Sequence, residues 1–141
     1  MISQIILGSF LVVLSVVIQV TLFEIAGKVL QRQIDATRTL PLKFSTFVVT
    51  ASAFTTWLLL GLLVIVCLWT ILFLGLDVFS TVEEGFYFSL VAFTTLGFGD
   101  VILPEQWRVL SGFVAVDGFL LFGLNTAVMI EVMMRLRGRA D

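Results

Sequence analysis

The longest stretch of this chain without a charged side chain runs for 32 residues, from Phe44 to Gly75. A helix rises about 1.5 Å per residue, so roughly 20 residues cross the ~30 Å hydrocarbon core of a bilayer. A second uncharged run covers the 22 residues from Ile2 to Phe23. Hydrophobic residues make up 60% of the 141-residue chain, against about half in soluble domains. The sequence therefore predicts an integral membrane protein.

The same reasoning predicts three membrane spans in all. Residues 109–136 form a third apolar stretch, interrupted by Asp117, Asn125 and Glu131. The run from Ile2 to Phe23 lacks the basic region of a cleaved signal peptide and exceeds its usual apolar core of roughly 7–15 residues. We therefore place an N-terminal transmembrane helix within residues 1–27, with a cleaved signal peptide as the alternative.

Charged residues indicate the orientation of these spans. The basic connection 28–43 and the end of the third span are rich in cations, which are Lys28, Arg32, Arg38, Lys43, Arg135, Arg137 and Arg139. The positive-inside rule places both segments in the cytoplasm. The intervening connections are acidic, with Asp77, Glu83, Glu84, Asp100 and Glu105. We expect a multi-pass protein of the cell (inner) membrane, with an extracytoplasmic N-terminus and a cytoplasmic C-terminus. No span carries the arginine ladder of a voltage sensor.

A short helix is expected between the second and third spans. The run Thr81-Val82-Glu83-Glu84 has the S/T-x-x-E pattern of a capping box, which predicts a helix over residues 82–94. Thirteen residues are too few to cross a bilayer, and a polar, glycine-rich stretch follows them. We interpret this part as a re-entrant segment, which is tolerated at membrane depth where protein and a water-filled pore surround it.

The glycine-rich stretch is Thr94-Thr95-Leu96-Gly97-Phe98-Gly99-Asp100. Carbonyl oxygens of successive residues can point to one side only if φ alternates in sign, and glycine adopts positive φ without a steric penalty. Gly97 and Gly99 stand two apart, as this alternation requires. Rows of such carbonyls replace the hydration shell of a permeating cation. We interpret residues 95–100 as an ion-selectivity filter.

This stretch resembles the T-V-G-Y-G-D signature of potassium channels, with Leu96 in place of Val and Phe98 in place of Tyr. Trp107 follows at the spacing used by the pore-only prokaryotic channels, and residues 117–127 resemble their inner helix around its hinge glycine. The resemblance covers Phe44 to Arg137, so the N-terminal helix is an addition to the family pattern.

The resemblance implies an all-α pore domain over residues 44–137, with outer helix 44–75, pore helix 82–94, filter 95–100 and inner helix 109–136. Potassium ions would bind the carbonyls of Thr95, Leu96, Gly97 and Phe98, with the Thr95 hydroxyl as a further ligand and Gly99 closing the row. One filter per chain cannot surround an ion, and the signature occurs once, so we expect a homotetramer. The expected activity is passive, potassium-selective flux across the lipid bilayer, without a cofactor and without nucleic acid.

The inner helix is expected to line a cavity below the filter. On a helical net, one stripe contains Phe119, Phe122, Thr126, Ile130 and Met134. Gly118 is either a hinge or a site of close helix packing. Asp117 departs from the resembled channels, which mostly have a small or amide residue at this position. An acid inside a span is costly unless it faces water or a partner. It is either a pH-sensitive charge near the filter or upper cavity, or a neutral acid bonded to Thr94 or to a neighbouring helix.

The outer end of the filter needs support. In the resembled channels an acid and an aromatic donor on the pore helix hold the aspartate that follows the last filter glycine. Counting back from Thr95, the position of the acid is Val91 and that of the aromatic donor is Tyr87. We therefore predict a hydrogen bond from Tyr87 to Asp100. The alternative is that Tyr87 only packs at the membrane interface while Asp100 faces water.

Other activities have little basis in this sequence. The chain has no histidine and a single cysteine, Cys67, and no carboxylates stand at metal-ligand spacing. We therefore do not expect an enzyme. Two alternatives to a potassium channel stay open, namely a weakly selective cation channel and a non-conducting, channel-like membrane subunit. The sequence does not indicate a regulatory partner.

Overall fold

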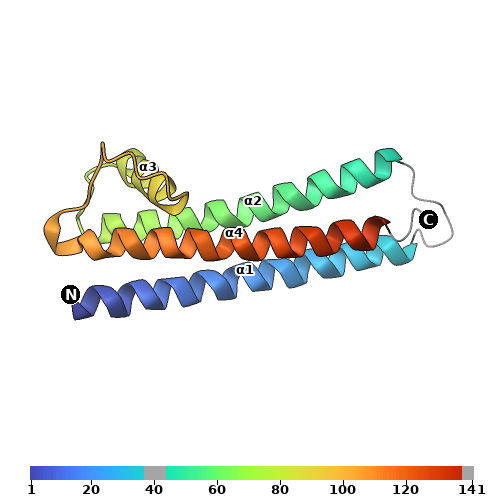
Figure 1. Cartoon of the computed structure of the whole chain (residues 1–141), viewed down its shortest axis with the longest axis horizontal. Helices are drawn as coiled ribbons and strands as arrows, with labels where there is room; N and C mark the ends of the chain where they lie inside the picture. The colour runs from blue at the N-terminus through green and yellow to red at the C-terminus, as the bar shows by residue number, and fades with distance from the viewer. Residues whose placement is uncertain (37–43, 138–141) are drawn as a thin grey trace.

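The computed structural model describes residues 1–36 and 44–137, and this part of the chain is helical without strands. Its elements are α1 (Ile2–Ala36), α2 (Phe44–Gly75), α3 (Val82–Phe93), the 3-10 turn η1 (Glu105–Trp107) and α4 (Arg108–Arg137). Figure 1 shows α1, α2 and α4 side by side, with α1 and α4 running in one direction and α2 in the other. The short helix α3 lies against one end of this bundle (Figure 1).

Three helices are long and apolar enough to cross a membrane, over Ile2–Arg32, Thr46–Gly75 and Glu105–Arg137. This confirms the prediction of an all-α membrane protein with three long apolar helices. The bounds of α2 coincide with those expected for the outer helix. Helix α3 ends one residue before the expected end of the pore helix, and α4 extends one residue beyond each expected end.

The prediction that a loop begins at Lys28 is wrong, because α1 continues without interruption to Ala36. No glycine or proline lies between Lys28 and Ala36, and most of these residues have good helix propensity. A charged side chain ends the apolar run but does not end the helix, since it can reach water from a helical backbone. The remainder of the predicted connection, with Arg38, Pro41 and Lys43, lies outside the described residues, as does Arg139.

Helix α1 packs along α4 through a stripe of small and polar residues at helical spacing. Near its start, Gln4 donates to the carbonyl of Gln106 and accepts from the backbone N–H of Val109 at 3.2 Å. One turn later the absence of a side chain at Gly8 leaves room for the ring of Phe113. Membrane helices associate through such small residues and interhelical hydrogen bonds, because lipid gives apolar side chains no reason to prefer protein.

The same stripe continues toward the middle of the bundle. Gln19 is fully buried, and its Nε2 donates to Oδ1 of Asn125 at 2.7 Å. Gly61 of α2 lies against the Gln19 amide, so a larger residue there would collide with it. The polar residues of α1 thus take part in its packing against α2 and α4. The resemblance, which begins at Phe44, had given them no role.

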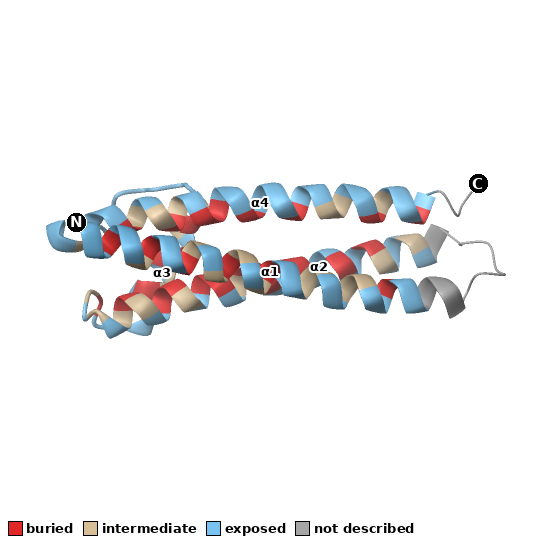
Figure 2. Cartoon of the chain, turned by 90° about the horizontal axis from the view of Figure 1, so that it is seen from below, coloured by how far each residue is buried: buried red, intermediate tan, exposed pale blue. Residues whose placement is uncertain are grey.

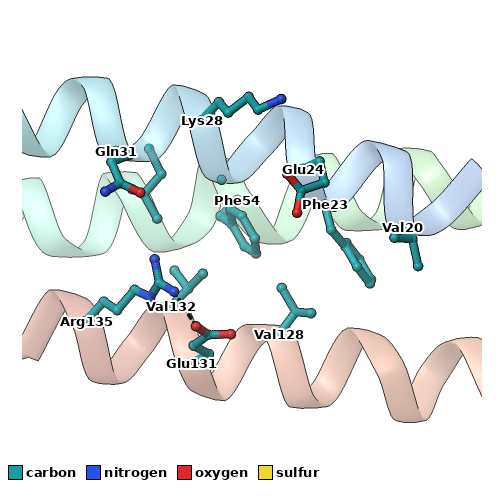
Figure 3. A pocket seen from close by; sticks show the side chains of 12 residues that line it. Val20, Phe23, Glu24, Lys28, Gln31, Phe54, Val128, Glu131, Val132 and Arg135 are labelled. Atoms are coloured by element: carbon teal, nitrogen blue, oxygen red, sulfur yellow. Dashed lines mark hydrogen bonds and ion pairs between the residues drawn. The ribbon is translucent and has the colours of Figure 1, made fainter.

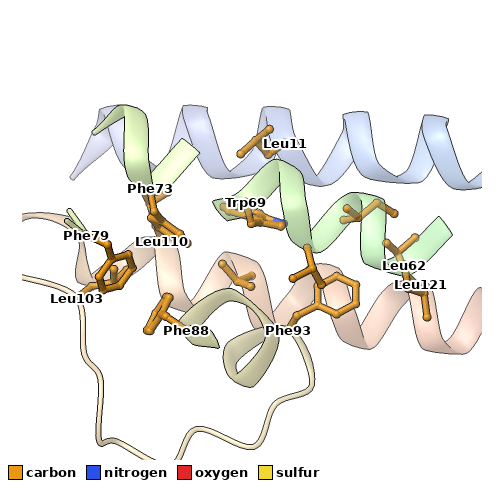
Figure 4. Close-up of a cluster of buried hydrophobic side chains, with 13 residues drawn as sticks. Leu11, Leu62, Trp69, Phe73, Phe79, Phe88, Phe93, Leu103, Leu110 and Leu121 are labelled. Carbon is orange, nitrogen blue, oxygen red and sulfur yellow. The ribbon is translucent and has the colours of Figure 1, made fainter. Parts of the chain in front are cut away.

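An aromatic cluster holds α3 against α2 (Figure 4). Phe73 of α2 makes edge-to-face contacts with Phe79 and Phe88, at ring-centroid distances of 6.0 Å and 5.4 Å. Trp69 stacks on Phe73 at 6.0 Å. Offset and edge-to-face pairs of this kind add to the energy of apolar contact. Figure 2 shows that buried residues line the inward faces of the helices, while one face of α4 is exposed along its length.

Candidate functional site

The start of α3 has the predicted capping geometry. Thr81 has extended backbone angles, φ −128° and ψ 150°, and its side chain accepts from the backbone N–H of Glu84 at 3.2 Å. Glu83 and Glu84 lie in the first turn, where carboxylates stabilise the positive end of the helix dipole. The sequence thus fixes where α3 begins, one short connection after α2.

The segment containing α3 leaves and returns to the same end of the bundle (Figure 1). The end of α3 approaches α4 very closely, because a Cβ added at Gly118 would overlap the carbonyl oxygen of Phe93. The ring of Phe93 also meets Phe122 edge-to-face, with centroids 5.6 Å apart. Close packing at Gly118 is therefore present in the structure, whereas bending at Gly118 stays a prediction.

The backbone that follows α3 alternates in the sign of φ. Gly97 has φ +54° and Gly99 has φ +79°. Thr95 also has positive φ, +61°, whereas neither Leu96 nor Phe98 does. Positive φ therefore occurs at every second residue from 95 to 99, including the two glycines that the sequence places there. Thr95 adopts this conformation at a cost that glycine does not incur.

The amide groups of this stretch point back toward α3. The N–H of Leu96 and the N–H of Gly97 both donate to the carbonyl of Val91, at 3.1 Å and 3.5 Å. A trans peptide directs the preceding carbonyl to the opposite side, so the carbonyls of Thr95 and Leu96 point away from α3. Within the part of the chain that the structure describes, the carbonyls of residues 95–98 accept no hydrogen bond. These oxygens are free to bind a ligand.

The hydroxyl of Thr94, predicted to support the filter, donates to the carbonyls of Leu90 at 2.9 Å and Val91 at 3.2 Å. Its backbone N–H also donates to Leu90. Thr94 thus closes the last turn of α3 and does not reach Asp117. This geometry fixes the point at which the chain turns from helix into the extended stretch.

The predicted hydrogen bond at the far end of the stretch is confirmed. The Tyr87 hydroxyl of α3 donates to Oδ2 of Asp100 at 2.6 Å. This bond lowers the pKa of Asp100 below its ordinary value, because the hydroxyl stabilises the carboxylate. The same bond raises the pKa of Tyr87, because loss of the phenol proton would remove it. The contact therefore joins the two ends of residues 87–100.

We expect Tyr87→Phe to make currents decline faster under sustained conduction, because it removes the hydrogen bond that holds Asp100. The folded-state pKa of Asp100 is depressed, so the bond stabilises the fold above the ordinary pKa of an aspartate and is lost as pH falls through the depressed value. In Tyr87→Phe the pKa of Asp100 returns toward its ordinary value. Acid on the side of the membrane that Asp100 faces should therefore protonate this carboxylate, and reduce the current, at a higher pH than in the wild type. Current recordings across acidic pH test this, and identical time courses and pH profiles would contradict it.

The position of Asp117 corrects one prediction. Of the two alternatives for Asp117, a charge near the filter or upper cavity is wrong, because its side chain is fully buried between helices. The indole Nε1 of Trp69 in α2 donates to its Oδ2 at 2.8 Å, and Ser15 of α1 approaches the same carboxyl group. Phe119, two residues later and roughly 200° around the helix, is 74% exposed. The bond to a neighbouring helix is therefore the correct alternative, and the bond to Thr94 is not.

The neighbours of Asp117 in the structure, Trp69 and Ser15, were not identified from the sequence. A signal was present, because an acid within a span requires a partner and Ser15 and Gln19 stand four residues apart on the first apolar run. Oδ1 of Asp117 has no hydrogen-bond partner among the described residues. The carboxyl group therefore depends on the Trp69 bond.

We expect Trp69→Phe to lower the stability of the assembled protein, because it leaves a fully buried carboxyl group without its donor, at a cost of about 1–3 kcal/mol. Asp117→Leu should be destabilising as well, since it strands the indole N–H. The double variant should lose less stability than the two single variants lose together, because neither polar group is then left without its partner. Thermal unfolding of the three variants measures this coupling, and strict additivity would mean that the bond contributes nothing.

The other residues predicted to line a cavity share one face of α4. Phe119, Phe122, Thr126, Ile130 and Met134 are all exposed in the single chain. The hydroxyl of Thr126 donates to the carbonyl of Phe122 at 2.8 Å, within its own helix. The structure therefore leaves this stripe open, on the side of α4 away from Asp117, and its contact with a pore stays a prediction.

Comparison with known proteins identifies the family of this architecture. A family model described as an ion channel matches residues 52–135. The match begins within α2 and ends near the end of α4, so it covers α3 and the extended stretch and leaves out α1. Searches of curated proteins and of solved structures gave no significant match. The chain therefore belongs to the ion channel family, in which two transmembrane helices flank the pore segment as in potassium channels.

Proposed function

We propose that this ion channel protein conducts potassium ions selectively and passively, through a pore formed by four copies of the chain. One observation carries the proposal. The sign of φ alternates, with positive values at Thr95, Gly97 and Gly99, and no hydrogen bond from a described residue reaches the carbonyls of residues 95–98. A row of such carbonyls offers a potassium ion the oxygen ligands that it loses with its hydration shell.

Exposed side chains around the extended stretch support an assembly of several copies. Leu96 and Phe98 flank the proposed ion path, and their side chains are 60% and 66% exposed in the single chain. Phe119 and Met134 on the open stripe of α4 are also exposed. Four copies around one axis would bring these surfaces together and enclose an ion, which a single extended stretch cannot do.

The surrounding elements suggest how each part contributes to conduction. The carbonyls of Thr95, Leu96, Gly97 and Phe98 would bind ions in single file, with the Thr95 hydroxyl as a further ligand. The negative end of the α3 dipole lies beside the start of this row and favours a cation there. The Tyr87–Asp100 bond would hold the other end of the row open.

Charge distribution supports an orientation in the membrane. The charged residues of the α3 end of the bundle are mainly acidic, whereas α1 and α4 end with basic residues, which are Lys28, Arg32, Arg135 and Arg137. We therefore propose that the α3 end is extracytoplasmic and the opposite end cytoplasmic.

Flux through purified protein in liposomes tests the function. With potassium on one side and sodium on the other, the proposal predicts a reversal potential close to the potassium equilibrium potential. A reversal potential near zero would indicate a weakly selective cation channel instead. Absence of flux across a range of pH and voltage, with the assembly intact, would identify a non-conducting subunit.

A further inference from the structure

A crevice of about 630 Å³ opens between α1, α2 and α4 at the end of the bundle opposite α3 (Figure 3). Its apolar lining consists of Val20, Phe23, Leu30, Phe54, Val128 and Val132. Gly27 belongs to the α1 wall, and no atom lies within 4 Å of a Cβ built there. The lack of a side chain at Gly27 therefore leaves this part of the wall open.

One end of the crevice is polar. Glu24, Lys28 and Gln31 line it from α1, and Glu131 and Arg135 line it from α4. Nη2 of Arg135 forms an ion pair with Glu131, and among the residues that the structure describes its guanidinium has no other hydrogen-bond partner. Figure 3 shows the Arg135 side chain reaching from α4 toward α1, in the direction of Gln31. Hydrogen-bond donors thus approach the crevice from two helices.

The depth of the crevice matches a membrane interface. The uncharged run of α1 ends at Phe23, and the charged residues begin at Glu24. On α4, Glu131 is the first charged residue after Asp117. Apolar and charged lining residues therefore meet where both helices leave the hydrocarbon core. Glu131 and Arg135 also stand on a different face of α4 from Ile130 and Met134, so the crevice is separate from the proposed ion path.

We propose that this crevice binds a phospholipid from the leaflet at which α1 and α4 end. One acyl chain would lie along the apolar walls beside Gly27, and the phosphate group would accept from Arg135 and Gln31. A guanidinium forms strong, charge-assisted hydrogen bonds with a phosphate, which favours a phospholipid over a ligand without an anionic group. The bound lipid would join α1 to α4, and this inference does not depend on potassium selectivity.

Native mass spectrometry of the assembled protein tests the site with three probes. Phosphatidylglycerol has both the tail and the phosphate, diacylglycerol has the tail alone, and glycerophosphate has the phosphate alone. The proposal predicts retained phosphatidylglycerol and little retention of the other two. Equal retention of diacylglycerol would reduce the site to a non-specific apolar surface, and equal retention of glycerophosphate would make it an anion site without a lipid.

Matched variants locate the binding. Gly27→Phe should fill the crevice and abolish retention of phosphatidylglycerol, whereas Gly27→Ala should keep it. The double variant Glu131→Gln/Arg135→Gln removes both members of the ion pair, so neither is left as an unpaired charge. It should weaken the binding of phosphatidylglycerol roughly tenfold or more, as the loss of a charge-assisted hydrogen bond implies. Arg137→Gln, which removes a cation outside the crevice, should bind like the wild type. Retention that is unchanged in both Gly27→Phe and the double variant would overturn the proposal.

Discussion

Gly97→Ala and Gly99→Ala should each abolish potassium-selective conduction. Both glycines have positive φ, +54° and +79°, and an L-residue in the left-handed region costs about 1–2 kcal/mol. An alanine can avoid this cost only by rotating the peptide, which would turn a carbonyl away from the row. No atom lies within 4 Å of a Cβ at either position, so within a single chain the effect is conformational and not steric.

Gly75→Ala is the matched control for these variants. Gly75 also has open space around an added Cβ, but its φ is not positive. We expect the control to conduct with wild-type selectivity, measured by the same reversal potentials in liposomes. Wild-type potassium selectivity in both Gly97→Ala and Gly99→Ala would remove residues 95–99 from the ion path.

Gly118→Ala should disrupt the pore unit through packing. The added Cβ would overlap the carbonyl oxygen of Phe93, which is backbone and cannot rotate away. Overpacking of this kind costs about 1–3 kcal/mol. The displaced residue is the last of α3, directly before the turn into the extended stretch 95–100. We therefore expect a lower thermal stability of the assembly together with reduced or unselective current.

Gly123→Ala provides the comparison for Gly118→Ala, because nothing lies within 4 Å of a Cβ at Gly123. We expect its thermal stability to equal or slightly exceed that of the wild type, since alanine favours a helix. The two interpretations of Gly118 give different results. A hinge predicts altered opening at unchanged stability, so that outcome for Gly118→Ala would contradict the packing account.

The sequence predicts the helices and part of the site well, because those features depend on local patterns. The uncharged run from Phe44 to Gly75 predicted the bounds of α2, and the capping box at Thr81 predicted the start of α3. The spacing of Gly97 and Gly99 anticipated where φ is positive. The Tyr87–Asp100 bond followed from the resemblance to potassium channels, by counting back from Thr95 to the position of their aromatic donor.

Contacts between helices were harder to predict for a physical reason. In a soluble helix the apolar stripe shows which side is buried, but a membrane helix is apolar on its lipid face and on its packed face alike. The side of α4 on which Asp117 lies could therefore not be read from hydrophobicity. The same ambiguity hid the bonds that Gln4 and Gln19 make to the α4 region.

The length of α1 shows a different limit. The basic residues of 28–43 predicted a loop from Lys28 onward, but hydropathy and charge report membrane depth and not backbone conformation. The helix continues to Ala36 because nothing in residues 28–36 breaks it. This extra length supplies Lys28 and Gln31 to the crevice beside α4.

An electron cryomicroscopy map of the intact protein in potassium chloride tests the central claim most directly. Our account predicts four copies around one axis, with the carbonyls of Thr95, Leu96, Gly97 and Phe98 facing it and separate peaks of density along the axis between them. An assembly of another stoichiometry, or four copies whose residues 95–98 turn their carbonyls away from an empty axis, would contradict it.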